Sequence, residues 1–116
     1  MTSSNDAGDK DLIHEKIMAI KDDIERMLGP YCSEKYEVIW YGAYNIDPMH
    51  LVFWICVQTD TMKSALSKNT LLNSELRQLL EKHQYPLPAR PFVYFGYESQ
   101  QSVNRESKGN WYHHFK

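Results

Sequence analysis

The chain has 116 residues, of which 42% are hydrophobic and 24% are charged, and its formal net charge is −2. This is the composition of one soluble globular domain, and so weak a net charge gives no sign of a nucleic-acid partner. No apolar run approaches the roughly 20 residues of a membrane helix, and the polar start MTSSNDAGDKD has no signal-peptide core, so we expect a cytoplasmic protein without a membrane partner.

The amino-terminal part of the chain predicts one helix. We expect residues 1–8 to form a disordered polar tail and residues 9–116 to form a single domain. Apolar side chains recur at steps of three and four from about Asp11 to Leu28, and the Gly-Pro pair that follows ends this helix. The apolar stripe consists of Ile13, Ile17, Ile20, Ile24 and Met27.

Residues 36–58 predict two strands joined by a tight turn. Val, Ile, Trp, Tyr and Phe dominate both flanks, and Asp47 followed by Pro48 favours a turn between them. The segment Leu51–Val57 is apolar without interruption. We therefore place this second strand in the centre of the sheet.

The second half of the chain predicts a helix, a strand, a short helix and a last strand. The helix covers about residues 60–83, with a break near Asn69 because the polar side chains there compete for backbone hydrogen bonds. Residues 92–97 form the third strand, and Ser99 can cap a short helix. Residues 110–115 form the last strand.

The predicted fold class is α+β. The order α-β-β-α-β-(short α)-β indicates a two-layer sandwich, in which two helices pack on one face of a mostly antiparallel four-stranded sheet. The two cysteines, Cys32 and Cys56, are far apart in the sequence, which argues against both a disulfide framework and a zinc site.

The aromatic residues carry the main functional signal. None of the fifteen aromatic residues precedes Tyr31, and most fall on the predicted strands. Because two helices can cover only one face of the sheet, we expect Tyr and Trp side chains to form a patch on the other face. The alternative is that a partner subunit or the carboxy-terminal segment covers this face. The predicted binding residues are Trp40, Tyr41, Tyr44, Tyr94, Tyr97, Arg105, Trp111 and His113.

The polar segment from Glu98 to His114 is the second candidate site. As an enzyme site it would offer Glu98 or His113 as a base and Arg105 as an anion clamp; otherwise it is a capped turn with a solvated face. On a strand, His113 and His114 point to opposite faces and cannot chelate one metal ion. No GxSxG, P-loop, HExxH or CxxC motif is present, so we assign no catalytic residue, metal or cofactor.

These observations favour a non-enzymatic protein-protein interaction module that binds another protein or a second copy of itself. Its acidic first half and aromatic face suit a small neutralising protein of the immunity or antitoxin kind. The alternative is a homodimeric small-molecule-binding or catalytic domain, with a pocket at the carboxy-terminal segment lined by Tyr41, Tyr94, Trp111 and Arg105. Few basic residues flank the aromatic residues of the first three strands, which argues against nucleic acid.

Overall fold

Three strands form the sheet, in the order β1-β2-β3. The computed structural model describes residues 5–114, with the side chains of residues 12–111 and of His114. Strand β1 (Glu37–Tyr41) runs antiparallel to β2 (Val52–Val57), and β3 (Tyr94–Ser99) runs parallel to β2. The α+β class and the central place of β2 are confirmed. The prediction of four strands in a mostly antiparallel sheet is wrong, because the sheet has one antiparallel and one parallel pair.

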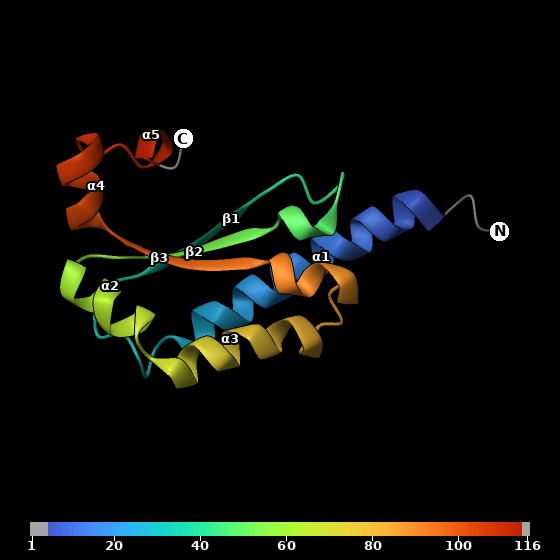
Figure 1. Ribbon diagram of the computed structural model, residues 1–116, viewed down its shortest axis with the longest axis horizontal. Coiled ribbons are helices and arrows are strands. Elements are labelled where there is room, and N and C mark those ends of the chain that lie inside the picture. Colours follow the sequence, from blue (N-terminus) through green and yellow to red (C-terminus); the bar gives the residue numbers. More distant parts are fainter. Residues whose placement is uncertain (1–4, 115–116) are drawn as a thin grey trace.

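Helices α1 (Asn5–Met27) and α3 (Thr70–Lys82) pack on one face of the sheet (Figure 1). The predicted stripe explains the contact, because the side chains of Ile17, Ile20 and Ile24 are fully buried where they face the sheet. Helix α1 begins at Asn5, so residues 5–8 of the predicted tail belong to the helix, and residues 1–4 lie outside the described residues. Among the described helices, none combines the length and the apolarity needed to cross a bilayer.

The predicted second helix is divided in two, as the sequence indicated. Helix α2 (Asp60–Ser67) ends just before Asn69, and the side chain of Asn69 caps α3 by accepting a hydrogen bond from the Leu72 amide at 3.0 Å. The two short 3-10 helices η2 (Pro48–His50) and η3 (Leu87–Phe92) contact each other beside the starts of β2 and β3. Tyr85 joins them to the core, because its buried hydroxyl donates to the Pro48 carbonyl at 2.6 Å.

The carboxy-terminal segment consists of α4 (Gln100–Ser107) and α5 (Trp111–His114). Ser99 caps α4 as predicted, since its hydroxyl accepts from the Ser102 amide at 3.0 Å. The predicted strand over residues 110–115 is wrong for its described part, which forms α5. Lys108 and Gly109 both have positive φ angles, 51° and 83°, and this turn carries the chain back over the sheet on the side opposite α1 and α3 (Figure 1).

A buried carboxylate ties α1 to the end of α3. Asp23 is only 8% exposed, and it accepts hydrogen bonds from Lys82 at 2.8 Å and from Arg26, with His83 Nε2 at 2.7 Å. Burial alone would raise the pKa of Asp23. The hydrogen bonds from Lys82, His83 and Arg26 lower this pKa by a larger amount, so the net pKa lies well below the ordinary value.

This depressed pKa predicts a specific loss of stability in acid. The contribution of ionised Asp23 to the free energy of unfolding is fully present above about pH 3.9, the pKa of this group in the unfolded chain. It is lost as the pH falls towards the lower pKa of Asp23 in the folded protein. We expect Asp23→Asn to lower the free energy of unfolding at pH 7 by about 1–3 kcal/mol and to flatten its decline below about pH 4. Urea unfolding at several pH values measures both effects. Asp22→Asn is the matched control, because Asp22 is exposed in the same helical turn; equal behaviour of the two variants would contradict this role.

Candidate binding surface on the open face of the sheet

The sheet face opposite α1 and α3, which we call the open face, consists of three rows of cross-strand neighbours. The strand pairing places Tyr41 beside Val52 and Val52 beside Tyr94 in the first row. Because side chains alternate along a strand, every second residue of each strand contributes to the same face. The nine residues of the open face are Tyr41, Val52, Tyr94, Ile39, Trp54, Gly96, Glu37, Cys56 and Glu98.

The first two rows carry exposed aromatic side chains. Tyr41 is 43% exposed and Tyr94 is 53% exposed, although both belong to strands that bury their other face. The indole of Trp54 lies between them: its Nε1 donates to the Tyr41 hydroxyl at 2.9 Å, and its ring meets Tyr94 edge-on with centroids 5.5 Å apart. Gly96 makes room for this arrangement, since a Cβ atom there would lie 2.5 Å from ring carbons of Trp54 and Tyr94.

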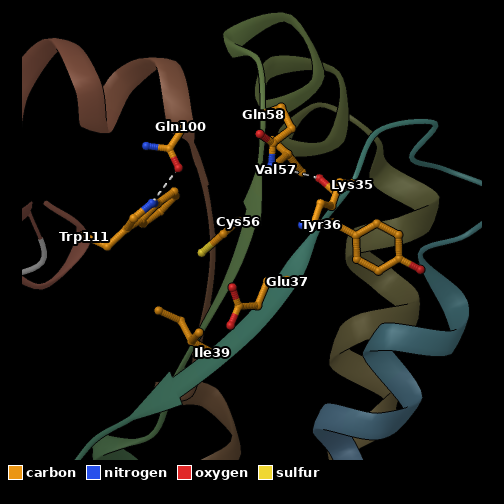
Figure 2. A pocket seen from close by; sticks show the side chains of 9 residues that line it. All are labelled: Lys35, Tyr36, Glu37, Ile39, Cys56, Val57, Gln58, Gln100 and Trp111. Carbon is orange, nitrogen blue, oxygen red and sulfur yellow. Dashed lines mark hydrogen bonds between the residues drawn. The ribbon is translucent and has the colours of Figure 1, made fainter. Parts of the chain in front are cut away.

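Glu37 and Cys56 of the third row line the floor of a pocket of about 270 Å³ between the sheet and the carboxy-terminal segment. We call it the Trp111 pocket, and Figure 2 shows Trp111 on one side of Cys56 and Glu37 on the other. The Trp111 indole is held in place by donating its Nε1 hydrogen to Gln100 at 2.8 Å. The lining residues are Lys35, Tyr36, Glu37, Ile39, Cys56, Val57, Gln58, Gln100 and Trp111.

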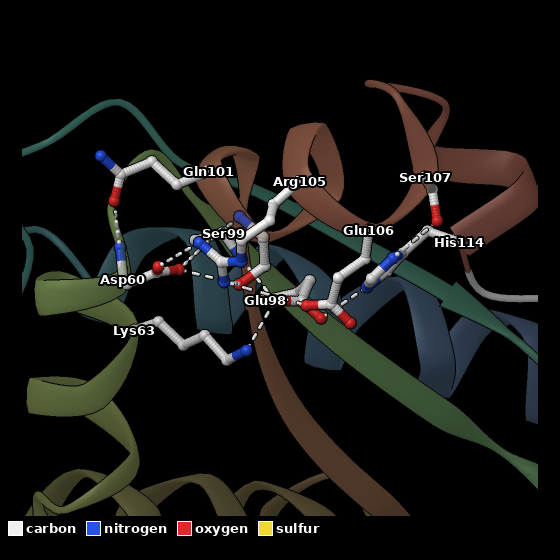
Figure 3. Close-up of polar contacts among 10 residues, drawn as sticks. Asp60, Lys63, Glu98, Ser99, Gln101, Arg105, Glu106, Ser107 and His114 are labelled. Carbon is white, nitrogen blue, oxygen red and sulfur yellow. Dashed lines mark hydrogen bonds and ion pairs between the residues drawn. The ribbon is translucent and has the colours of Figure 1, made fainter.

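Glu98 fastens the carboxy-terminal segment to the sheet (Figure 3). One oxygen of this buried carboxylate accepts from Lys63 at 2.7 Å and from the Ser99 amide at 2.9 Å, and the other lies 2.6 Å from His114 Nε2. Burial raises the pKa of Glu98, but the hydrogen bonds from Lys63 and His114 and the backbone outweigh burial, so its net pKa is lowered. The carboxylate therefore stays ionised at neutral pH.

A second polar cluster joins the starts of α2 and α4 beyond the ends of β2 and β3. Asp60 accepts hydrogen bonds from Ser99 at 2.5 Å, from Ser102 at 2.8 Å and from Arg105 at 3.0 Å (Figure 3). These bonds lower the pKa of Asp60 to about 2. Because the guanidinium of Arg105 is already paired with Asp60, this cluster holds two helices together rather than offering a vacant anion clamp.

One chain of contacts resembles the nucleophile, base and carboxylate of acyl-transfer enzymes. Ser107 Oγ lies 3.0 Å from His114 Nδ1, and His114 Nε2 faces Glu98. Such chemistry also needs free donors for an oxyanion. Among the described residues, the backbone amides after Ser107 are already engaged: those of Lys108 and Gly109 donate to Val103, and that of Asn110 donates to Ser107. The arrangement thus fits a fastening of α5 better than a catalytic centre.

The structure separates the predicted binding residues. Tyr41 and Tyr94 lie on the open face, and Trp111 lies in the pocket at its end. Trp40 and Tyr44 lie on the other side, where their rings meet at 5.8 Å and both contact His14 of α1. The other three predicted residues do not belong to the open face as described. Tyr97 is a core residue whose hydroxyl donates to Asn73 at 2.8 Å, Arg105 pairs with Asp60, and the His113 side chain lies outside the described residues.

Several residues of this surface were not among the predicted binding residues. Trp54 and Glu37 could have been found from the alternation of side chains, because each shares a strand face with an exposed tyrosine or a pocket residue. Ile39 gave no signal beyond its apolar character. His114 was passed over because a strand was expected, and its contact with Glu98 depends on α5. A pocket exists at the carboxy-terminal segment, but Tyr41, Tyr94 and Arg105 do not line it.

No protein-family model matches this chain, and neither a curated protein nor a solved structure resembles it significantly. The functional interpretation therefore depends on the geometry of the open face.

Proposed function

We propose that this protein is a non-enzymatic interaction module that docks a different protein on the open face of its sheet. The observation that carries the proposal is the exposure of Tyr41 and Tyr94 around Trp54. Rigid aromatic side chains with a polar atom are the residues that most often dominate the binding energy of protein interfaces. A small neutralising protein, such as an immunity protein or antitoxin, would use such a surface to cover its partner.

The charges of the open face favour a different protein over a second copy. The nine residues of the face include two carboxylates, Glu37 and Glu98, and no basic residue. Glu98 is paired with Lys63 and lies 2.6 Å from His114 Nε2, whereas Glu37 is exposed and, within the described residues, forms no ion pair. Two copies packed face to face would bring their Glu37 carboxylates onto faces whose nine residues include no base, and a partner with basic residues avoids this cost.

The proposal predicts that Tyr41→Ala combined with Tyr94→Ala abolishes partner binding without unfolding the protein. Loss of two interface anchors should weaken binding by about 1,000-fold, at roughly 2 kcal/mol for each anchor. A photo-crosslinking residue placed at Val52 identifies the partner, and titration with the wild type and the double variant gives the two affinities. Leu71→Ala is the control, because Leu71 is 62% exposed on the helix layer.

Two results would contradict the proposal. One is light scattering that gives a dimer at every concentration across a hundredfold dilution, with the dimer broken by the two Tyr substitutions. The other is a partner whose affinity falls equally for the double variant and for Leu71→Ala. A monomer in light scattering, with binding lost only in the double variant, supports a heterologous partner.

A further inference from the structure

The Trp111 pocket has the size of a single side chain. Its volume of about 270 Å³ lies just below the range of about 300–1,000 Å³ typical of small-molecule sites. One wall is apolar and is formed by Ile39 and Cys56, and the Trp111 ring forms the opposite wall (Figure 2). A bound group with an extended apolar chain would place that chain between these walls. The charges around the pocket then determine whether the polar end of this bound group, the guest, is positive or negative.

Glu37 places a carboxylate at the floor of the pocket. Glu37 and Glu98 flank Cys56 directly, one on each neighbouring strand. Burial raises the pKa of the Cys56 thiol to about 12, and the charges of Glu37 and Glu98 both add to this effect. Cys56 therefore stays a neutral thiol, and a positive group above it would be attracted by the exposed carboxylate of Glu37.

Lys35 is the only basic residue among the described lining residues. Its backbone carbonyl accepts a hydrogen bond from Gln58 at 3.3 Å, and its exposed ammonium forms no ion pair with Glu37 in the described part of the chain. With respect to the described residues, Glu37 is thus available to bind a cationic group. Because Lys35 would oppose a positive guest, removing its charge should strengthen the binding of that guest.

We propose that the Trp111 pocket receives a lysine or arginine side chain of the protein partner. The carboxylate of Glu37 binds the cation, the Trp111 ring attracts it, and Ile39 contacts its apolar stem. This inference rests on the proposed function, because the pocket and the aromatic rows belong to the same open face. The inference adds that the pocket selects a basic residue of the partner by its positive charge and its apolar chain.

The test uses small probes and needs no knowledge of the partner. The full chain is titrated with n-butylguanidinium and n-butylammonium, and with n-butanol and butyrate as neutral and anionic controls of similar shape. The readout is the indole N–H resonance of Trp111, assigned by its loss in Trp111→Phe. We expect saturable shifts for the two cations, with Kd of order 1 mM, and no saturable shift for butanol or butyrate.

Charge variants sharpen the test. Glu37→Gln should weaken the binding of both cations by about fivefold, the upper range for a partly exposed ion pair, and Lys35→Gln should strengthen it. Glu81→Gln is the matched control, because Glu81 is exposed on α3 in the helix layer. Butyrate binding as tightly as the cations, or equal affinities in Glu37→Gln and Glu81→Gln, would overturn the proposal.

A final comparison distinguishes a side chain from a free small molecule. The blocked tripeptide acetyl-Gly-Arg-Gly-amide should bind at least as tightly as n-butylguanidinium if the pocket accepts a side chain. If the free cation binds and the tripeptide does not, the pocket is a small-molecule site and the inference is wrong. Either result leaves the Tyr41 and Tyr94 test untouched, so failure of the pocket and failure of the proposed function are separate outcomes.

Discussion

Replacing Glu98 by alanine should release the carboxy-terminal segment from the sheet and lower the free energy of unfolding by about 3 kcal/mol. This is the low end of the range for removing one partner of a buried ion pair, because Lys63 keeps access to water. The change leaves the Ser99 amide, Lys63 and His114 without the carboxylate that each now contacts. Urea unfolding measures the stability, and the Trp111 indole N–H resonance reports whether Trp111 stays over the pocket.

Glu106→Ala is the control for this prediction. Glu106 belongs to α4 and is exposed, and its ion pair with Arg105 is long at 3.9 Å, so its loss should change stability by less than about 0.5 kcal/mol. Glu98→Gln keeps acceptor capacity and should fall between the two. If Glu98→Ala and Glu106→Ala unfold at the same urea concentration with the same Trp111 resonance, Glu98 does not fasten the segment.

Gly96→Ala should displace the Trp54 ring and destabilise the protein by about 1–3 kcal/mol, the usual cost of forcing extra atoms into a packed site. The added Cβ would lie 2.5 Å from carbons of Trp54 and Tyr94, so at least one ring must move. Movement of Trp54 would break its hydrogen bond to Tyr41. The Trp54 indole N–H resonance and urea unfolding measure the two effects.

Two comparisons show whether crowding is the cause. Gly29→Ala should be almost neutral, because the nearest atom to its added Cβ is a backbone oxygen at an ordinary 3.9 Å. Combining Gly96→Ala with Trp54→Ala should cost less than the sum of the single changes, since the second change removes the obstructing ring. Additive costs in the double variant would show that the two positions do not contact each other.

Features fixed by short stretches of sequence were predictable. The isoleucine stripe of α1, the interruption at Asn69 and the Ser99 cap each depend on residues within one or two helical turns. Side-chain alternation also separates the residues of β1 and of β3 into two faces. It did not determine which group faces the helices, and so Trp40 and Tyr97 were expected on a binding surface although both lie on the helix side.

The carboxy-terminal segment was not predictable in the same way. Its aromatic residues suit a strand, but Trp111 contacts Gln100 and His114 contacts Glu98, and these tertiary contacts are compatible with a single helical turn. Intrinsic preference for strand is a weak influence when side chains bind elsewhere. The pocket depends on the same contacts, so neither its existence nor its lining follows from local sequence.

The parallel pairing of β2 with β3 has a consequence for the order of folding. Strands β1 and β2 are neighbours in the chain, whereas α2 and α3 lie between β2 and β3 in the sequence. Distant pairing is slow because loop-closure entropy must be overcome first. Each row of the open face includes a residue of β3. We therefore expect the binding surface to be the last part of the molecule to form, so that a partly folded chain would not recognise its partner.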